Sequence, residues 1–481
     1  MAEEEKVGAL DAVLNSIAET VHGVLMPHKK NGHKSFIENW FSIHSWVDFV
    51  GDWAISRGAF LVLLYIPLFL AASNLFPPFP TLTLGWLFIS LPVVGSAGLV
   101  LGFWHVWIWY VQSNYIFQRT NPVLLEVRMP ADITKSPRAM EQVLNSFWIK
   151  SGMTTFYDRN WFGGVNPYVS LELASFGGEI HFFIWCRKSY RNIIESAMYS
   201  QYPEVEIVEV EDHATRFEYD PQKHWCWATD YKYDNRTDAY PIKTYVDFEL
   251  DKDPKEELKV EPYASVLEVL SAMNKDEQVW IQIVMKGNFD KPTKEGSWYK
   301  NVQKEVEKIR EAASQQVELD DHGKEKKKTG FPRPTHAQTE TMRSMERNLS
   351  KLTFDVGMRG MYITAAGKGR SPEFSAYRWI WRPFNSSNFM NGLRPKGAHN
   401  DFDYLWQDWN GVRWNLVARR YFDAFRRRQF FHSPWHMQEV PMRMSTEVLA
   451  TLWHPPSRTV QPPGLQRIAV SKSEAPPNLP M

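Results

Sequence analysis

Three short segments carry residue types that could bind a phosphate or a metal ion. The first is AAGKGRS, residues 365–371, which contains the Gly-Lys pair of a phosphate-binding loop. Such a loop also needs a glycine five positions before that pair, and Ser or Thr directly after the lysine. Tyr362 and Gly369 occupy these two positions, so the pattern fails at both ends. We interpret the segment as a turn after a strand and predict no nucleotide site there.

The other two segments carry possible metal ligands. In VEDHATRFEYD, residues 210–220, the candidate ligands are Glu211, Asp212, His213, Glu218 and Asp220. No helical spacing places them on one face, and carboxylates at a strand end are normally solvated. In HSPWH, His432 and His436 are four residues apart, but Pro434 prevents the helix that would align the two imidazoles. We therefore predict no catalytic residue, no cofactor and no metal site.

A basic stretch with interleaved aromatic residues covers residues 413–430. Arginines with aromatic neighbours can hold a phosphate backbone and stack on bases. The alternative is a helix whose aromatic side chains face the core while its arginines reach water. We favour the core-facing helix. Nucleic-acid binding stays the rival interpretation, and its contact residues would be Arg419, Arg420, Arg426, Arg427 and Arg428.

The composition restricts the classes of partner. Lys plus Arg and Asp plus Glu number 55 each, so no overall charge favours nucleic acid or an acidic partner. Cys186 and Cys226 have no zinc-binding spacing, and we predict that both are reduced thiols. The chain has 21 tryptophans, and many of them cluster in and around the N-terminal apolar region, which is typical of a protein at a membrane interface.

The apolar region itself is residues 58–118, which contain no Lys, Arg, Asp or Glu. A membrane-spanning helix needs about 20 apolar residues. The length therefore predicts two transmembrane helices, near 58–76 and 83–112, joined by a Pro-rich turn. We predict a multi-pass protein of the cell (inner) membrane, and its orientation follows from the positive-inside rule, because lysines and arginines flank the pair on both sides. Both termini and the bulk of the chain would then be cytoplasmic. Residues 1–57 precede this pair and are expected to hold an interfacial amphipathic helix, or alternatively a packed soluble one.

The chain after the apolar region is predicted to be α+β. Residues 119–215 follow the order β-α-β-β-α-β, which is the ferredoxin-like plan. A second ferredoxin-like unit is predicted at 240–445, with its first strand at 242–250, its last at 440–445 and a helical insertion at 295–350. Residues 446–481 would form a C-terminal helix, which begins at Ser445 and Thr446, followed by a Pro-rich tail.

Several segments together resemble the membrane-anchored N-terminal region of bacterial proteins related to the conjugative DNA-transfer, or type IV secretion, ATPases. They are RNIIESAMYSQYPEVEIVEVED, KLTFDVGMRGMYIT, FDYLWQDW, STEVLATLWHPPS and RIAVSKSEAPPNLP. The resemblance runs from the apolar region to the last residue. In such relatives a similar helix and proline run come directly before a hexameric FtsK-like motor domain. This sequence has the lead-in and stops at Met481, so the resemblance implies either that the motor is a separate chain or that a membrane scaffold has kept the docking region for another purpose.

We therefore expect a non-enzymatic scaffold of a type IV secretion-like machine. Its partners would be the lipid bilayer, further copies of the same chain and a separate motor ATPase. The residues predicted to face the motor are Trp406, Trp409, Glu447 and Trp453. The rival, from another functional class, is a membrane-tethered nucleic-acid-binding protein that uses the stretch 413–430.

Overall fold

The structure of the protein is a computed structural model. It describes residues 57–150, 152, 155–234, 237–252, 261–319, 325–329, 331, 333–368, 372–386, 389–397, 399, 408–432 and 441–468. The chain divides into two compact units, residues 1–99 with 402–410 and residues 100–401 with 411–481. The helix expected before residue 57, Trp406 and the tail after Ile468 lie outside the described residues.

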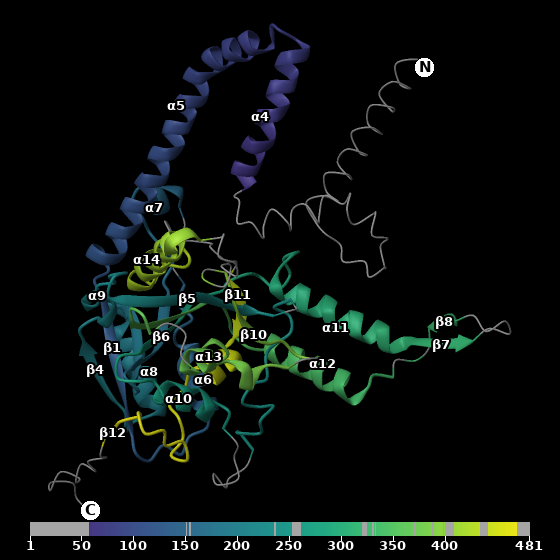
Figure 1. The fold of residues 1–481 in the computed structure, drawn as a ribbon. Coiled ribbons are helices and arrows are strands. Elements are labelled where there is room, and N and C mark those ends of the chain that lie inside the picture. The colour runs from purple at the N-terminus through teal and green to yellow at the C-terminus, as the bar shows by residue number, and fades with distance from the viewer. Residues whose placement is uncertain are drawn as a thin grey trace, which may run out of the picture. The chain divides into compact units, whose positions relative to one another are not determined.

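Two apolar helices open the described part of the chain (Figure 1). They are α4, Arg57–Leu75, and α5, Phe79–Asn114. Pro77 and Pro78 stand between them, where a proline disfavours helix in the residue before it. The segment Phe79–Arg119 is 41 residues long, and its most apolar 18-residue window has a mean hydropathy of 2.0 with 0% of its residues buried. Among the described helices it is the one long and apolar enough to span a membrane, and Tyr65–Leu75 forms a shorter apolar helix.

Helix α5 leads directly into the sheet of the second unit. A single π-helical turn, Tyr115–Arg119, follows α5, and strand β1 begins at Pro122. Ile116 in this turn is fully buried. Because only two residues separate the turn from β1, the C-terminal end of α5 must lie close to the start of this strand.

One 10-stranded sheet forms the centre of the second unit. Its neighbours run in the order β10-β5-β9-β6-β2-β3-β1-β12, while β4 pairs with β1 and β11 with β9. All these pairs are antiparallel except the short parallel pair of β1 and β12. The strands are β1 Pro122–Pro130, β2 Val169–Phe176, β3 Glu179–Arg187, β4 Glu206–Val210, β5 His224–Tyr233, β6 Gln278–Gly287, β9 Thr353–Ala365, β10 Leu393–Lys396, β11 Met442–Ser445 and β12 Arg467–Ile468.

The elements predicted between residues 119 and 215 are present. Strands β1 to β4 alternate with α6, Pro137–Asn145, and α8, Arg191–Gln201, in the expected order. Gly177 and Gly178 join β2 to β3 with φ angles of 60° and 92°. A left-handed conformation of this kind favours glycine, which is why the pair marks a hairpin turn.

The second half of the sheet differs from the prediction in its first and last strands. Residues 242–250 form no strand, and 245–252 are turns. Both the main-chain nitrogen and the hydroxyl of Thr244 donate to the carboxylate of Asp247, at 2.8 and 3.0 Å. Such local side-chain bonds compete with a strand ladder. The strand that fills this role is β5, and β10 lies at the edge beside it, whereas β11 pairs with the start of β9.

Helices cover both faces of the sheet. The larger hydrophobic core lies under α6, α8, α10 (Tyr263–Ser271), α13 (Pro372–Arg378) and α15 (Thr446–Leu452). The second core lies under α9 (His213–Arg216) and α14 (Val412–Arg426). This double cover explains why every residue of β2 except its last is buried. Short 3₁₀ turns stand at Lys188–Tyr190, Arg382–Phe384 and Trp409–Gly411.

The predicted helical insertion forms an arm. It contains α11, Trp298–Ser314, and α12, His336–Leu349, with the hairpin of β7, Gln315–Leu319, and β8, Glu325–Thr329, between them. The two helices match the prediction, whereas the hairpin between them was not predicted. The arm has a small core of its own, which joins Trp298 and Val302 of α11 to Met342 and Met345 of α12.

Candidate membrane-proximal site

A short helix packs against the C-terminal half of α5. This helix is α7, Phe156–Asn160, and a capping box of Thr155 and Asp158 begins it. Trp104 of α5 stacks on Phe156 with ring centroids 6.4 Å apart. Trp107 contacts the edge of Trp161 at 5.5 Å and donates a hydrogen bond to the Asn160 carbonyl at 2.9 Å. The contacts fix α7 beside the last turns of the apolar helix.

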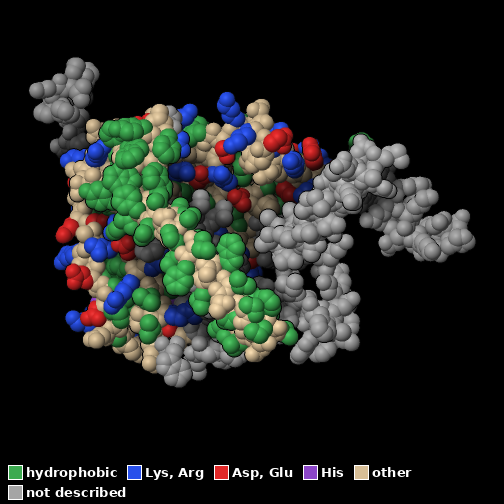
Figure 2. Space-filling model, turned by 90° about the horizontal axis from the view of Figure 1, so that it is seen from above, with side chains coloured by type: hydrophobic (Ala, Val, Ile, Leu, Met, Phe, Trp, Pro, Cys, Tyr) green, Lys and Arg blue, Asp and Glu red, His purple; other side chains and the backbone are tan. Residues whose placement is uncertain are grey.

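The outer side of α7 is unusually aromatic. Four neighbouring side chains are 42 to 67% exposed, namely Phe156, Tyr157, Trp161 and Phe162. Together with Trp104 and Trp107 we call them the aromatic collar. Figure 2 shows hydrophobic side chains gathered on the face of the molecule that is seen from above. Aromatic residues that carry a polar group favour the boundary between a bilayer and water.

A glycine permits the close approach of the collar to α5. Gly163 has a φ of +71°, and a Cβ atom there would lie 2.3 Å from the main-chain oxygen of Val111. We expect Gly163→Ala to separate residues 155–166 from α5, because a backbone carbonyl cannot move aside like a side chain. Main-chain hydrogen exchange of this segment in the full chain should then become faster by about tenfold or more.

Gly296→Ala is the matched control for this experiment. Gly296 has a φ of +73°, yet nothing lies within 4 Å of its would-be Cβ. It therefore reports the cost of the left-handed backbone alone, about 1 to 2 kcal/mol. Unchanged exchange of residues 155–166 in Gly163→Ala would show that the contact with Val111 does not hold the collar in place.

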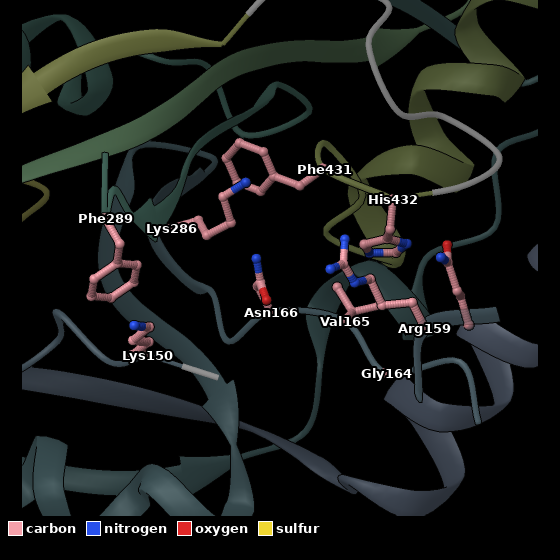
Figure 3. Close-up of a pocket in the computed structure, with 10 residues that line it drawn as sticks. Lys150, Arg159, Gly164, Val165, Asn166, Lys286, Phe289, Phe431 and His432 are labelled. Carbon is pink, nitrogen blue, oxygen red and sulfur yellow. The ribbon is translucent and has the colours of Figure 1, made fainter. Parts of the chain in front are cut away.

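A cavity of about 360 Å³ opens beside the collar, and one residue of α5, Gln112, lines it. We call it the cationic cavity, because its lining includes Lys150, Arg159 and Lys286 and no carboxylate. Figure 3 shows the side chains of Arg159 and Asn166 directed into the space between Lys286 and His432. The remaining lining residues are Gly164, Val165, Phe289 and Phe431.

A buried arginine supports one wall of the cationic cavity. Arg187, at the end of β3, is only 5% exposed. It donates to the carbonyl oxygens of Val165 and Asn166, at 2.7 and 3.3 Å, and lies over the Tyr115 ring. In the described part of the chain its contacts are therefore main-chain oxygens and a ring, and its charge adds to the positive potential of the cavity.

Lys286 enters the cavity from the end of β6. Its Nζ lies 4.7 Å from the centroid of the Phe431 ring and 3.3 Å from a carboxylate oxygen of Asp355. Asp355 also pairs with Arg443, which has a second carboxylate partner in Asp290 at 3.7 Å. Burial, followed by the charge of Arg443, lowers the pKa of Lys286. An anion beside Lys286 would favour the charged form of its amine.

The arginines that the nucleic-acid interpretation uses do not form one continuous surface. Arg419, Arg420 and Arg426 are exposed on α14, whereas Arg427 pairs with Asp423 at 2.8 Å and lies over the Trp109 ring. Arg428 is completely buried. The aromatic residues that would stack on bases are also buried, in the core under α14, and they are Tyr421, Phe422, Phe425 and Phe430. The prediction that Arg428 contacts nucleic acid is therefore wrong, and the core-facing orientation of the aromatics is confirmed.

Arg428 serves an internal ion cluster instead. Its Nε and Nη2 donate to the two oxygens of Glu172 at 2.9 and 3.0 Å, and Nη2 donates to Asp212 at 3.0 Å. Burial raises the pKa of Asp212, but the charge and hydrogen bonds of Arg428 outweigh burial and hold this pKa below its ordinary value. Asp212 therefore stays ionised beside Arg428.

Two of the four residues predicted to face a motor lie in the interior. Glu447, at 0% exposure, accepts from Arg347 and Thr244 and pairs with Lys351 at 2.9 Å. Trp453 is also 0% exposed and donates to the Glu172 carbonyl at 3.2 Å. Their prediction as surface residues is wrong, because α15 packs on both sides instead of exposing a polar face. Trp409 begins a 3₁₀ turn, and Trp406 lies outside the described residues.

The possible metal segment is not a ligand set. Among the described residues, no group of three or more His, Cys, Asp or Glu side chains could hold a metal ion. Asp212 caps α9 and bonds Arg428, while both ring nitrogens of His213 are buried with no hydrogen-bond partner in the described structure. The imidazole lies among aromatic rings, including Phe183 and Trp280 at 5.1 and 4.8 Å.

This position of His213 predicts an acid-sensitive fold. Burial lowers its pKa to about 4, from an ordinary value of 6.5. Below pH 6.5 the unfolded chain binds a proton that the folded chain rejects, so stability falls as the pH drops towards 4. The His213 contribution at pH 5 is a loss of about 2 kcal/mol. His213→Phe should remove this part of the loss between pH 7.5 and 5, measured by urea unfolding. An identical loss in both proteins would contradict the assignment.

Sequence reasoning missed the aromatic collar and the cationic cavity. The segment TTFYDRNWFGG, residues 154–164, has four aromatic residues within seven positions directly after the first helix of the α+β part, and this was the available signal. For the cavity there was no local signal. Lys286 is far in the chain from Lys150 and Arg159, and only strand pairing brings β6 close to the segment after α6.

The comparisons with known proteins give one family. The family described as Domain of unknown function (DUF8128) matches residues 117–372, which is over half of the chain. The match begins at the end of the helical turn after α5 and includes the arm and strands β1 to β9. No curated protein shows a match to this chain.

Proposed function

This chain belongs to the DUF8128 family, and we propose that it is a non-enzymatic, membrane-anchored assembly component of a type IV secretion-like machine. The observation that supports a membrane anchor is the exposure of the segment Phe79–Arg119, whose most apolar window has no buried residue. Exposing so large an apolar surface to water is unfavourable, at about 25 cal/mol per Å². A lipid bilayer would cover it.

Helix length supports the same proposal. The 36 residues of α5 extend about 54 Å, whereas the hydrocarbon core of a bilayer is about 30 Å thick. Part of α5 would therefore emerge from the bilayer, and the half that packs against α7 is suited to this. The aromatic collar would then mark the headgroup region. The 19 residues of α4 extend about 28 Å, so we propose that α4 is the second crossing of a hairpin.

Charge supports a cytoplasmic position of the α+β part. Arg119 lies over the Phe162 ring of the collar, and the cationic cavity lies beside the same end of α5. Cations next to a membrane span favour the cytoplasmic side. We therefore propose a multi-pass protein of the cell membrane with both termini in the cytoplasm.

We propose that the sheet consists of two ferredoxin-like units. The strand order β4-β1-β3-β2 fits one unit and β10-β5-β9-β6 fits the other, and the two would meet where β2 pairs with β6. The buried charges pair with one another, as Arg428 does with Glu172, so they suit a structural role. Several copies of the chain would form a cytoplasmic ring, and a separate FtsK-like ATPase would dock on this ring.

The test of this function is purification of the full chain from its native membrane in mild detergent, with mass spectrometry of the bound proteins. We expect to recover an ATPase with Walker motifs, and to lose it when residues 469–481 are deleted. The deletion begins after Ile468 because α15 is part of the core and its removal would unfold the protein. A Gly/Ser tail of equal length is the control for chain length.

Recovery of nucleic acid without an ATPase would overturn this proposal in favour of the rival. In that case binding should weaken steeply with salt, because phosphate contacts release counterions. It should also depend on Arg419, Arg420 and Arg426, which are the exposed arginines of this stretch.

A further inference from the structure

We propose that the cationic cavity is a binding site for a phosphate group, and that a phospholipid headgroup of negative charge supplies it. Phosphate binding itself is independent of the proposed function, whereas the lipid source rests on the proposed membrane anchor. The position of the cavity favours a lipid as the source of the phosphate. Gln112 at the end of α5 lines the cavity, and the aromatic collar lies beside it.

The charge around the cavity matches an anion. Three cationic side chains line it, and Arg187 lies behind one wall. In the described part of the chain Lys150 contacts the Phe289 ring at 5.9 Å, and no carboxylate lies within ion-pair distance of it. Lys286 shares Asp355 with Arg443, and Arg443 also pairs with Asp290. The described residues that line the cavity therefore include three cations and no carboxylate.

The donor types match phosphate in particular. A guanidinium can hold two phosphate oxygens at once, and lysines add point charges. Arg159 comes from α7 and Lys150 from the segment after α6, while the Asn166 amide is directed into the space between them and Lys286 (Figure 3). Donors from separate elements can surround a tetrahedral group, which donors in one row cannot do.

The size and apolar walls match a headgroup rather than a bare ion. The volume of about 360 Å³ is in the range of sites for small organic ligands. Phe289 and Phe431 line one side of it and could contact a glycerol backbone. Headgroups of anionic lipids lie where a spanning helix leaves the bilayer on its cytoplasmic side.

The test uses the full chain in neutral detergent and three probes: dihexanoyl-phosphatidylglycerol, dihexanoyl-phosphatidylcholine and inorganic phosphate. Binding is measured from the rise of the thermal unfolding midpoint with ligand concentration. The variant K150Q/R159Q should bind phosphatidylglycerol about tenfold more weakly or worse, because it loses charge-assisted hydrogen bonds. Both side chains are exposed, so this variant should fold.

The matched control is R419Q/R420Q, which removes the same charge from exposed positions of α14. Its affinity should stay within about twofold of the unaltered chain, since surface charges outside the cavity act weakly through water. An equal loss in the control would overturn the proposal, because general charge would then explain the binding. Equal binding of phosphatidylcholine and phosphatidylglycerol, insensitive to K150Q/R159Q, would overturn it as well.

The probes also separate the two sources of phosphate. A midpoint shift with inorganic phosphate alone, abolished by K150Q/R159Q, would support the phosphate site and overturn the lipid source. Absence of binding with all three probes would overturn the site. Neither result depends on whether the chain is anchored in a membrane. Membrane anchoring is measured separately, by alkaline extraction of membranes. In that experiment K150Q/R159Q should behave like the unaltered chain.

Discussion

Arg428→Met should lower the free energy of unfolding by about 3 to 5 kcal/mol. The substitution leaves Glu172 as a buried carboxylate, at 1% exposure, without its bidentate partner. Asp212 also loses the guanidinium that donates to its carboxylate. The cost of such an uncompensated buried charge is larger than the net gain from forming the pair. Urea unfolding of the full chain in mild detergent, followed by tryptophan fluorescence, measures the difference.

Arg426→Met is the matched control, two residues away on the exposed side. Its expected effect is within about 0.5 kcal/mol. Arg428→Lys keeps the charge but loses the fork-shaped donor, and should be intermediate. If Arg428→Met unfolds like the unaltered chain yet loses nucleic-acid binding, the ion cluster is not structural and the rival function gains support.

Glu447→Gln should cost about 3 kcal/mol, near the lower end for a buried ion pair. Glu447 is the shared counter-ion of Arg347 and Lys351, at 2.8 and 2.9 Å. Asp247 and Glu141 keep part of the charge balance, since they also pair with Arg347 and Lys351. The same unfolding measurement applies.

The control for Glu447→Gln is Glu346→Gln on the arm. Glu346 pairs with Arg310 at 2.7 Å, but both side chains are more than half exposed. Such a surface pair contributes about 0 to 1 kcal/mol. A Glu447→Gln variant as stable as this control, but unable to bind a partner, would restore the surface role predicted from the sequence.

The first half of the sheet was predictable because its signals are local. Alternating apolar residues marked β1, the Gly177–Gly178 pair marked a hairpin, and Ser136 with Pro137 marked the start of α6. Each signal acts within a few residues, so a single sequence contains it. The apolar character of α4 and α5 was predictable for the same reason.

The second half was less predictable because its strands are chosen by pairing partners. Residues 242–250 alternate like a strand, but Thr244 and Asp247 bond each other and form a turn. Strand β10 has only four residues, and its position beside β5 depends on a strand far away in the chain. Pattern alone does not identify such a strand.

The interior charges were hidden for a related reason. A glutamate in a short helix normally faces water, which favoured a surface role for Glu447. Its burial depends on ion pairs with Arg347 of α12 and with Lys351, which follows α12. Both residues lie about a hundred positions earlier in the chain. The same holds for Arg428 and Glu172, which only the folded sheet brings together.

The central claim, a membrane anchor, is tested most directly by alkaline extraction of membranes that contain the full chain or the variant V94D/L101D. Val94 and Leu101 are 65% and 61% exposed on α5, so in water two aspartates there would cost little. In a bilayer each should cost about 3 kcal/mol. We predict that the unaltered chain stays in the membrane pellet and that the variant is released. An unaltered chain in the supernatant, or a variant retained as firmly as the unaltered chain, would contradict the account.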